Sequence, residues 1–176
     1  MNDKQHQQLI TILGQEKVLE ALMQHQNVMA VLPTGSGKSL IYQLYGYLES
    51  KLIVVVSPLL SLMQDQVSRM QYLGIKRAVA LNSLLNLKQR TFVMHHLTSY
   101  RYLYVSPEML ANNVLIRQLQ RFPIGLFVID EAHCISQWGP DFRPEYLNLQ
   151  RVLIQLKHPL TLMLTATATD RFKKIF

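Results

Sequence analysis

The sequence predicts a three-layer α/β domain with a mainly parallel central sheet. Six short runs rich in branched apolar residues alternate with stretches of helical spacing, and turn residues bound each run. Strands and helices that alternate at these lengths form βαβ units, which place a parallel sheet between two layers of helices. The run Leu-Ile-Val-Val-Val at 52–56 has no polar side chain, as expected for a strand buried on both faces.

The expected elements can be placed in order along the chain. The strands are expected at residues 27–32, 52–56, 78–81, 102–105, 125–129 and 160–164, and the helices at 16–25, 38–48, 59–73, 87–98, 113–121 and 144–156. In such sheets ligands bind beyond the carboxyl ends of the strands, so the loops at those ends are expected to carry function. Residues 170–176 begin like a helix and then stop, which indicates that the chain is cut there.

Length and composition are those of one compact domain. The chain has 176 residues, of which 49% are hydrophobic, and no linker or internal repeat divides it, so we expect a single domain over residues 1–176. Cys134 is the only cysteine, which excludes an internal disulfide and favours a reducing compartment. The N-terminus is too polar for a signal peptide, and no apolar run approaches the ~18 residues of a membrane span. We therefore expect a soluble, cytoplasmic protein.

The charge balance favours a polyanionic partner. Eighteen Lys and Arg residues against eleven Asp and Glu residues give a formal net charge of +7. A basic excess of this size promotes binding to nucleic acid, because neutralised phosphates release their counterions. The same charge is equally compatible with a basic protein that binds nothing acidic.

A glycine-rich loop follows the first strong strand and leads into the helix at 38–48. The loop and the start of the helix read Pro33, Thr34, Gly35, Ser36, Gly37, Lys38 and Ser39. The two glycines let backbone N–H groups turn inward around phosphate oxygens, and the helix N-terminus adds its positive dipole end. Lys38 can reach the β- and γ-phosphates, and the Ser39 hydroxyl can ligate Mg²⁺. The loop therefore predicts a nucleotide site rather than a simple helix cap, although the strict pattern has glycine where this chain has Leu32.

Two carboxylates follow the strand at 125–129. Asp130 at the strand tip is placed to hold Mg²⁺, and Glu131 can orient and deprotonate an attacking water. His133 can sense the γ-phosphate. Alone, such a pair more often forms a turn or a helix cap, but together with the phosphate loop it predicts hydrolysis of the nucleotide.

These segments together resemble a known family. Residues 33–39, 130–133 and 165–168 resemble motifs I, II and III of superfamily 2 helicases, and the run from Asp130 to Tyr146 resembles the RecQ family of DNA helicases, with Pro140 where that family usually has histidine. The resemblance implies the first of two RecA-like domains, with the second RecA-like domain and the C-terminal domains absent. It implies a P-loop NTPase that uses ATP and Mg²⁺ to move 3′-to-5′ along DNA, in a family that acts in DNA repair and recombination.

The same resemblance assigns residues to DNA binding or to its coupling with hydrolysis. Ser57, Asn82 and Ser106 lie at strand ends, where hydroxyls, amides and free N–H groups can hold a phosphate backbone without reading sequence. Each alone would be interpreted as a helix cap, and the alternative for Trp138, less favoured than DNA contact, is an aromatic packed into the core. The full set is Ser57, Pro58, Asn82, Ser106, Gln137, Trp138, Phe142, Arg143, Thr165 and Thr167. Pro140 stiffens the loop that contains Trp138 and Arg143.

The adenine end of the site departs from the family. Gln15 stands at the family's spacing from Lys38 and can bond the adenine edge, but residues 10–13 hold neither the arginine nor the aromatic that RecQ proteins usually carry. We therefore expect weaker selectivity for ATP. The favoured function is the ATP-binding half of a DNA helicase, with little activity in isolation. The alternatives are a nucleotide-dependent nucleic-acid-binding module without motor activity, an RNA helicase of the same superfamily or, more distantly, a P-loop kinase.

Overall fold

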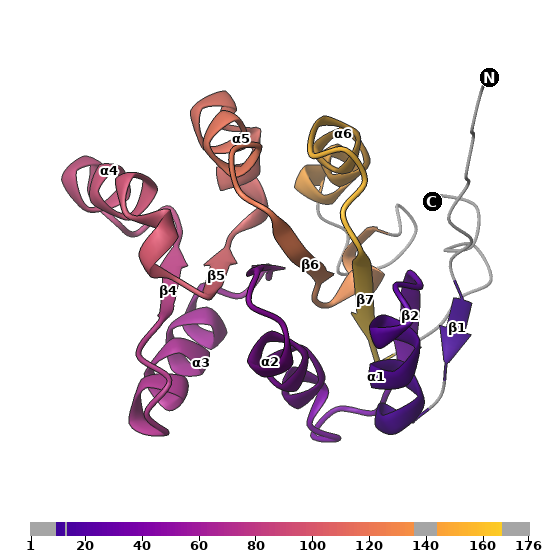
Figure 1. Cartoon of the computed structure of the whole chain (residues 1–176). Helices are drawn as coiled ribbons and strands as arrows, with labels where there is room; N and C mark the ends of the chain where they lie inside the picture. Colours follow the sequence, from indigo (N-terminus) through magenta and orange to yellow (C-terminus); the bar gives the residue numbers. More distant parts are fainter. Residues whose placement is uncertain (1–9, 13, 136–143, 167–176) are drawn as a thin grey trace.

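The computed structural model describes residues 10–12, 14–135 and 144–166 of the chain. Its strands form one sheet in the order β1-β2-β7-β6-β3-β5-β4, and every pairing between them is parallel (Figure 1). All six expected strands are present: β2 (Val28–Val31), β3 (Leu52–Val56), β4 (Ala78–Leu81), β5 (Tyr102–Val105), β6 (Ile124–Ile129) and β7 (Thr161–Thr165). The predicted α/β class with a parallel sheet is confirmed.

A seventh strand was not predicted from the sequence. β1 (Ile10–Ile12) pairs with β2, with Ile10 opposite Val28 and Ile12 opposite Ala30. Three residues are too few to show the alternation or the longer apolar run by which a strand is recognised. β1 forms the outer edge of the sheet immediately before α1, so residues 10–12 lie beside the first strong strand.

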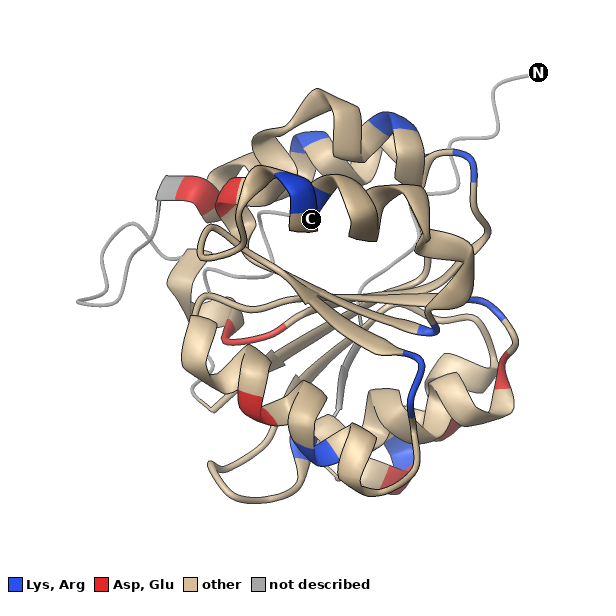
Figure 2. Ribbon diagram, turned by 90° about the vertical axis from the view of Figure 1, so that its left-hand side faces the viewer, with Lys and Arg blue, Asp and Glu red and all other residues tan. Residues whose placement is uncertain are grey.

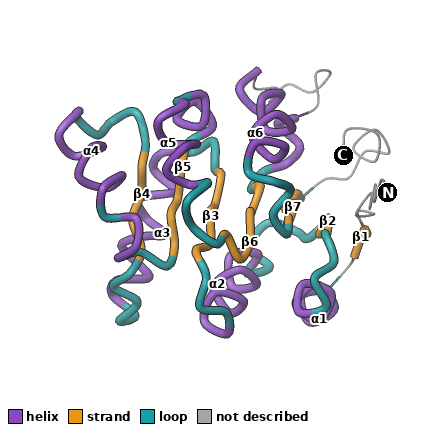
Figure 3. Tube along the Cα trace, turned by 45° about the horizontal axis from the view of Figure 1, so that its top comes forward, coloured by secondary structure: helices purple, strands orange, loops and turns teal. Residues whose placement is uncertain are grey.

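The helices cover both faces of the sheet. α1 (Gln15–Met23), α2 (Lys38–Leu48) and α3 (Leu60–Tyr72) lie on one face, and α4 (Leu87–His95), α5 (Asn113–Leu119) and α6 (Leu149–Gln155) lie on the other (Figure 3). Figure 2, viewed from the β4 edge, shows the two helical layers above and below the sheet. Along β3, Ile53 and Val55 belong to one core cluster and Val54 and Val56 to the other. The strand is therefore buried on both sides, as its sequence predicted.

Two helices are shorter than expected by three residues or more. α4 stops at His95, and its end tightens into a 3₁₀ turn at Leu97–Ser99, where the His96 N–H donates to the carbonyls of both Phe92 and Val93. The helix expected at 144–156 begins as a 3₁₀ turn, Pro144–Asn148, and only Leu149–Gln155 is α-helical. Such 3₁₀ turns are frequent at helix ends and have nearly the same hydrophobic spacing. No helix in the described ranges is long and apolar enough to span a membrane. The helix start expected at 170–176 falls outside those ranges.

The last described strand lies in the interior of the sheet. β7 pairs with β2 on one side and with β6 on the other. The Thr161 N–H donates to Asn27 Oδ1 at 2.9 Å at one end, and the Leu32 N–H donates to the Thr165 carbonyl at 3.0 Å at the other. The loops after β2 and β6 therefore open at the same end of the sheet, separated by one strand.

Candidate nucleotide site

The phosphate loop connects β2 to α2 with two residues in the left-handed region. Gly35 has φ +79° and Gly37 has φ +78°, values that side chains rarely allow. α2 begins at Lys38 with no side-chain cap and no acidic residue in its first turn. The first N–H groups of a helix have no acceptor within the helix. This N-terminus is therefore left for an anion, as in other phosphate-binding loops.

Two polar atoms at this loop are buried without a hydrogen-bond partner among the described residues, Ser36 Oγ and Lys38 Nζ. Such groups are rare in folded proteins because desolvation without a partner is costly. A hydroxyl, an ammonium and a helix N-terminus at one place are donors for phosphate oxygens. The donor set therefore fits the triphosphate of a nucleotide.

The acidic segment meets this loop across the end of β7. Glu131 Oε1 lies 3.6 Å from Lys38 Nζ, and Glu131 Oε2 lies 3.1 Å from His133 Nδ1. Glu131 has φ +50°, which is uncommon for a residue other than glycine. The structure thus brings Lys38, Glu131 and His133 together in one cluster, with the carboxylate between the two basic groups.

Asp130 immediately follows β6, and its environment disfavours the ionised form of its carboxyl group. Burial, and next the charge of Glu131, raise the pKa of its carboxyl to about 6, against partial compensation from the Glu131 N–H, Lys38 and His133. The Glu131 N–H donates to Asp130 Oδ1 at 3.0 Å. A half-buried carboxylate whose charge is under-compensated is a suitable ligand for an incoming cation.

A further residue supports this segment without having been assigned a role from the sequence. The Tyr146 hydroxyl donates to the Asp130 carbonyl at 3.0 Å, and the Tyr146 side chain is buried. A buried tyrosine usually directs its hydroxyl to a partner, so the position of Tyr146 at the end of the run from Asp130 to Tyr146 was the available signal. Tyr146 holds the backbone from which both carboxylates project.

The protein ligands for a metal ion are few. Within the described ranges no group of three or more His, Cys, Asp or Glu side chains could hold a metal ion. Mg²⁺ commonly takes one or two protein ligands and completes its shell with phosphate oxygens and water. Asp130, and Ser39 in the first turn of α2, suit a Mg²⁺ ion that arrives with a nucleotide.

A cavity of about 490 Å³ lies beside the loop at Gln15, the residue expected from the sequence to bond the adenine base. Gln15, the first residue of α1, donates its side-chain amide N–H to the Ser36 carbonyl, so this amide group is bound to the phosphate loop. Among the residues that the structure describes, those that line this cavity include neither an aromatic nor an arginine: they are Gly14, Gln15, Glu16, Lys17, Leu32 and Ser36. β1 occupies residues 10–12, and Leu13 lies outside the described residues.

Five residues assigned to DNA contact or coupling lie buried at strand ends: Ser57, Pro58, Asn82, Ser106 and Thr165. The expectation of free N–H groups is wrong for the two serines. The Ser57 N–H donates to the Val105 carbonyl at 3.2 Å and the Ser106 N–H to the Leu81 carbonyl at 3.3 Å, because the ladder continues one residue past each strand. Their hydroxyls, buried without a described partner, are the groups that remain.

Asn82 is also used within the protein. Its Oδ1 accepts from the Leu84 N–H at 3.0 Å, which is the local turn expected of an asparagine after a strand. The other assigned residues, Gln137, Trp138, Phe142, Arg143 and Thr167, lie outside the described residues, as does Pro140.

Comparison with known proteins identifies relatives along most of the chain. It is 52% identical over 156 residues to the probable ATP-dependent DNA helicase RecS of Bacillus subtilis, a match that covers 89% of this chain and 32% of the relative. It is 43% identical over 157 residues to the ATP-dependent DNA helicase RecQ of Haemophilus influenzae, covering 88% of this chain and 25% of that protein. The chain thus spans a third or less of the length of these curated relatives.

Solved structures and the family pattern agree. The helicase domain of Hef from Pyrococcus furiosus superposes with a TM-score of 0.68 at 24% identity, over 90% of this chain and 34% of that one, which shows a RecA-like fold. The sequence pattern of the DEAD/DEAH box helicases matches residues 13–175. The chain belongs to the DEAD/DEAH box helicase family.

Proposed function

We propose that this chain is the first RecA-like domain of a RecQ-type DNA helicase, and that with a second RecA-like domain it hydrolyses Mg²⁺-ATP to move 3′-to-5′ along DNA and unwind it. The observation that carries the proposal is the contact between Lys38 and Glu131, 3.6 Å apart although 93 positions separate them in the sequence. The names of the RecS and RecQ relatives support DNA and ATP as the substrates.

The proposed roles follow from the chemistry of each side chain. The loop from Pro33 to Gly37 wraps the phosphates, Lys38 neutralises the β- and γ-phosphates, and Ser39 and Asp130 hold Mg²⁺. Bound Mg²⁺ neutralises charge on the phosphate oxygens during transfer. Glu131 accepts a proton from the attacking water, and His133 reports the state of Glu131 to the neighbouring segments.

The Lys38–Glu131 contact supports an exchange of partners when nucleotide binds. Without phosphate, the Glu131 carboxylate lies within ion-pair distance of the Lys38 ammonium, at 3.6 Å. A γ-phosphate carries more negative charge and would draw Lys38 away. Glu131 would then be left with His133, 3.1 Å away, and its released oxygen could face the attacking water. Nucleotide binding thus prepares the base.

DNA contact is proposed at the ends of β3, β4, β5 and β7, through Ser57, Pro58, Asn82, Ser106 and Thr165. Because these residues are buried, direct contact with DNA would require local opening of the strand ends. Gln137, Trp138, Phe142, Arg143 and Thr167 are proposed by family resemblance to couple this contact to hydrolysis.

The 176-residue chain alone is expected to bind nucleotide and to hydrolyse it slowly. In the RecQ family an arginine on the second RecA-like domain completes the site, and an arginine supplied in trans is worth about 10³-fold or more in turnover. Nucleotide affinity is measured by calorimetry and turnover by phosphate release. Robust unwinding by the isolated chain would overturn this division of roles.

The motor function is tested in a longer chain that carries the second domain. Single-stranded DNA should stimulate ATP hydrolysis strongly and RNA only weakly. Stimulation by RNA alone would favour an RNA helicase, and no stimulation by either would favour a nucleotide-dependent binding module.

A further inference from the structure

Basic side chains precede five neighbouring strands of the sheet, at the edge opposite the nucleotide site. Each helix returns the chain to this edge, so the loops that enter β3, β4, β5, β6 and β7 lie along it. Figure 2 shows blue segments where the strands begin and red ones where β6 ends. Every one of these loops carries a lysine or an arginine. The six residues, which we call the basic row, are Lys51, Lys76, Arg77, Arg101, Arg121 and Lys157.

The backbone keeps the basic row contiguous. The Arg101 N–H donates to the Arg77 carbonyl at 2.7 Å, and the Ile53 N–H donates to the Arg101 carbonyl at 2.8 Å. Lys51 packs against the start of β6, since a Cβ on Gly125 would lie 2.8 Å from the Lys51 Cβ. Four strand spacings of about 4.8 Å separate β4 from β7, so the basic row is about 19 Å long.

The charge of the basic row is not neutralised within the described protein. Both ion pairs among the described residues involve Glu131, at the other end of the sheet. Arg77 and Arg101 donate to backbone carbonyls, which carry no net charge. The side chains of the other four residues are exposed and have no hydrogen bond to a described residue. Glu49 is the one carboxylate in these loops, so the row attracts polyanions.

Two tyrosines with unusual exposure lie at the helix ends that lead to the basic row. Tyr47, in the last turn of α2, is 81% exposed, and Tyr72, the last residue of α3, is 91% exposed. α2 and α3 are neighbours, because Gln43 Nε2 donates to Gln66 Oε1 at 3.3 Å, and packed helices lie about 8–10 Å apart. Exposed aromatic rings beside cations form the kind of surface on which bases stack.

This combination favours single-stranded nucleic acid over other polyanions. A linear row of cations fits a linear polyanion, whose phosphates it can follow. A duplex keeps its bases stacked inside, so the tyrosine rings would gain nothing from it. An acidic peptide has carboxylates but no flat faces that must stack. Leu48 and Leu73 are exposed near the tyrosines, which makes an anionic membrane surface the main competitor.

We propose that the basic row binds the backbone of single-stranded nucleic acid, whose bases stack on Tyr47 and Tyr72. This surface lies where the strands begin, so it is distinct from the DNA contacts proposed where β3, β4, β5 and β7 end. Contacts of this kind hold a strand without reading its sequence. The proposal does not depend on ATP hydrolysis.

The first test measures the salt dependence of binding. Fluorescence anisotropy of a labelled oligothymidylate of about 12 nucleotides follows its binding to the 176-residue chain. The triple variant Lys51→Gln, Lys76→Gln and Lys157→Gln should bind about tenfold or more weakly. The slope of the logarithm of affinity against the logarithm of salt concentration should become shallower by about 2, because each lost contact removes about 0.7. An unchanged slope overturns the proposal.

A matched triple variant controls for net charge. Lys17→Gln, Lys88→Gln and Arg151→Gln remove three exposed cations near the starts of α1, α4 and α6, at the opposite edge. This variant should change the slope by less than half as much. An equal or larger change would mean that the basic row is not the site.

A second test separates stacking from charge. Tyr47→Ala combined with Tyr72→Ala should weaken binding of oligothymidylate by about tenfold, but should leave binding of an abasic oligonucleotide of the same length unchanged. Phe92→Ala, at an exposed aromatic on the other face of the sheet, should affect neither ligand. Equal losses for the two ligands with the tyrosine variant contradict stacking.

The location and the competitors are tested directly. Oligothymidylate that contains 5-iodouracil should cross-link on irradiation to Tyr47 and Tyr72. Cross-links confined to the loops after the strands would overturn this inference and leave the proposed function standing. Displacement of oligothymidylate by polyglutamate of equal charge would assign the row to an acidic protein. Displacement by vesicles of phosphatidylserine and phosphatidylcholine in equal parts would assign it to a membrane. Either result, or no binding of oligothymidylate, overturns the proposal.

Discussion

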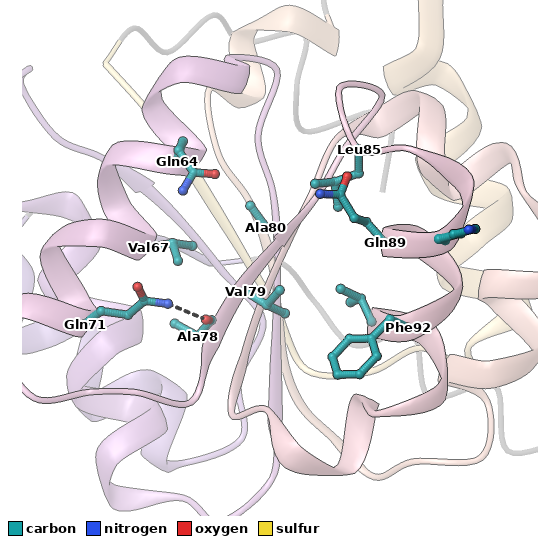
Figure 4. A pocket seen from close by; sticks show the side chains of 11 residues that line it. Gln64, Val67, Gln71, Ala78, Val79, Ala80, Leu85, Gln89 and Phe92 are labelled. Carbon is teal, nitrogen blue, oxygen red and sulfur yellow. Dashed lines mark hydrogen bonds between the residues drawn. The ribbon is translucent and has the colours of Figure 1, made fainter.

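The nucleotide end of the sheet and its β4 edge are built differently: the first holds buried polar atoms without a hydrogen-bond partner among the described residues, whereas β4 is buried between its helices. At the nucleotide end the groups are charged side chains and a helix N-terminus, gathered from segments 93 positions apart, Lys38 and Glu131. At the β4 edge a cavity lies between α3 and α4, walled mostly by glutamine and ordinary apolar side chains, and the Gln71 amide donates to the Ala78 carbonyl (Figure 4). The first region therefore depends on the identity of a few charged side chains, and the second on apolar packing that many side chains could supply.

The largest effect expected from this difference is at Glu131. In a chain that includes the second domain, Glu131→Gln should lower the turnover number for DNA-stimulated ATP hydrolysis by about 10²–10⁴-fold, because the amide cannot accept the water's proton. Phosphate release at saturating ATP measures this. Glu145→Gln, at an exposed position in the same part of the sequence, is the matched control. A decrease in turnover number of less than tenfold for Glu131→Gln would show that Glu131 is not the general base.

The next effect concerns Asp130 and the pH. Because the folded-state pKa of Asp130 is raised from 3.8 to about 6, its ionisation opposes folding, and this cost appears as pH rises through about 4 to 6. Asp130→Asn should therefore increase the free energy of unfolding at pH 7 without Mg²⁺, by about 1–3 kcal/mol. Urea unfolding at pH 7 and at pH 4 measures the gain, which should disappear at the lower pH.

A control for Asp130→Asn is the same change on the surface. Asp65→Asn, at an exposed position of α3, should alter the unfolding free energy by less than about 0.5 kcal/mol. An equal gain from both variants would mean that net charge, rather than the environment of Asp130, sets the stability.

A comparison of Gly37→Ala with Gly74→Ala distinguishes the cost of backbone strain from a loss of nucleotide binding. Gly37 has φ +78° and its missing Cβ would lie 3.2 Å from Gln15 Nε2, whereas Gly74 has φ +86° with nothing within 4 Å. Replacement of either by alanine should cost about 1–2 kcal/mol of stability from the left-handed conformation. Only Gly37→Ala should also weaken nucleotide binding, measured by calorimetry. Unchanged affinity would show that the loop does not wrap the phosphates.

The smallest effect is in nucleotide choice. Since no aromatic or arginine of the described part of the chain lines the cavity near Gln15, ATP and GTP should bind with free energies within about 1 kcal/mol of each other, about the worth of a missing stacking contact. Parallel calorimetric titrations of the two nucleotides decide this, and a strong preference for ATP would refute the expectation.

Local patterns predicted most of the fold. The strands at 52–56, 78–81 and 102–105 and the helix at 38–48 have the bounds expected, because each is bordered by turn residues and has unambiguous spacing. β1 was not predicted, because three residues are too few to show the alternation of polar and apolar side chains that identifies a strand. The proximity of Lys38 and Glu131 followed from the rule that carboxyl ends of parallel strands meet.

Other features depend on tertiary structure. The use of the Ser57 and Ser106 N–H groups inside the sheet depends on where the ladder ends, and no local residue pattern indicates that. The bond from Tyr146 to the Asp130 carbonyl required knowing how a 3₁₀ turn packs beneath the strand tip. The cavity at β4 has no motif, because many apolar residues would form equivalent walls.

The interior position of β7 also constrains how the molecule is made. Until residues 161–165 have left the ribosome, the nascent chain can form only the pair β1-β2 and, separately, the group β6-β3-β5-β4. The hydrogen bond from the Thr161 N–H to Asn27 Oδ1 can form only after Thr161 is synthesised, 134 residues after Asn27. Synthesis proceeds at roughly 5–20 residues per second. The phosphate loop therefore stays apart from the acidic segment for several seconds after the loop has been synthesised. The two halves of the nucleotide site are therefore joined last.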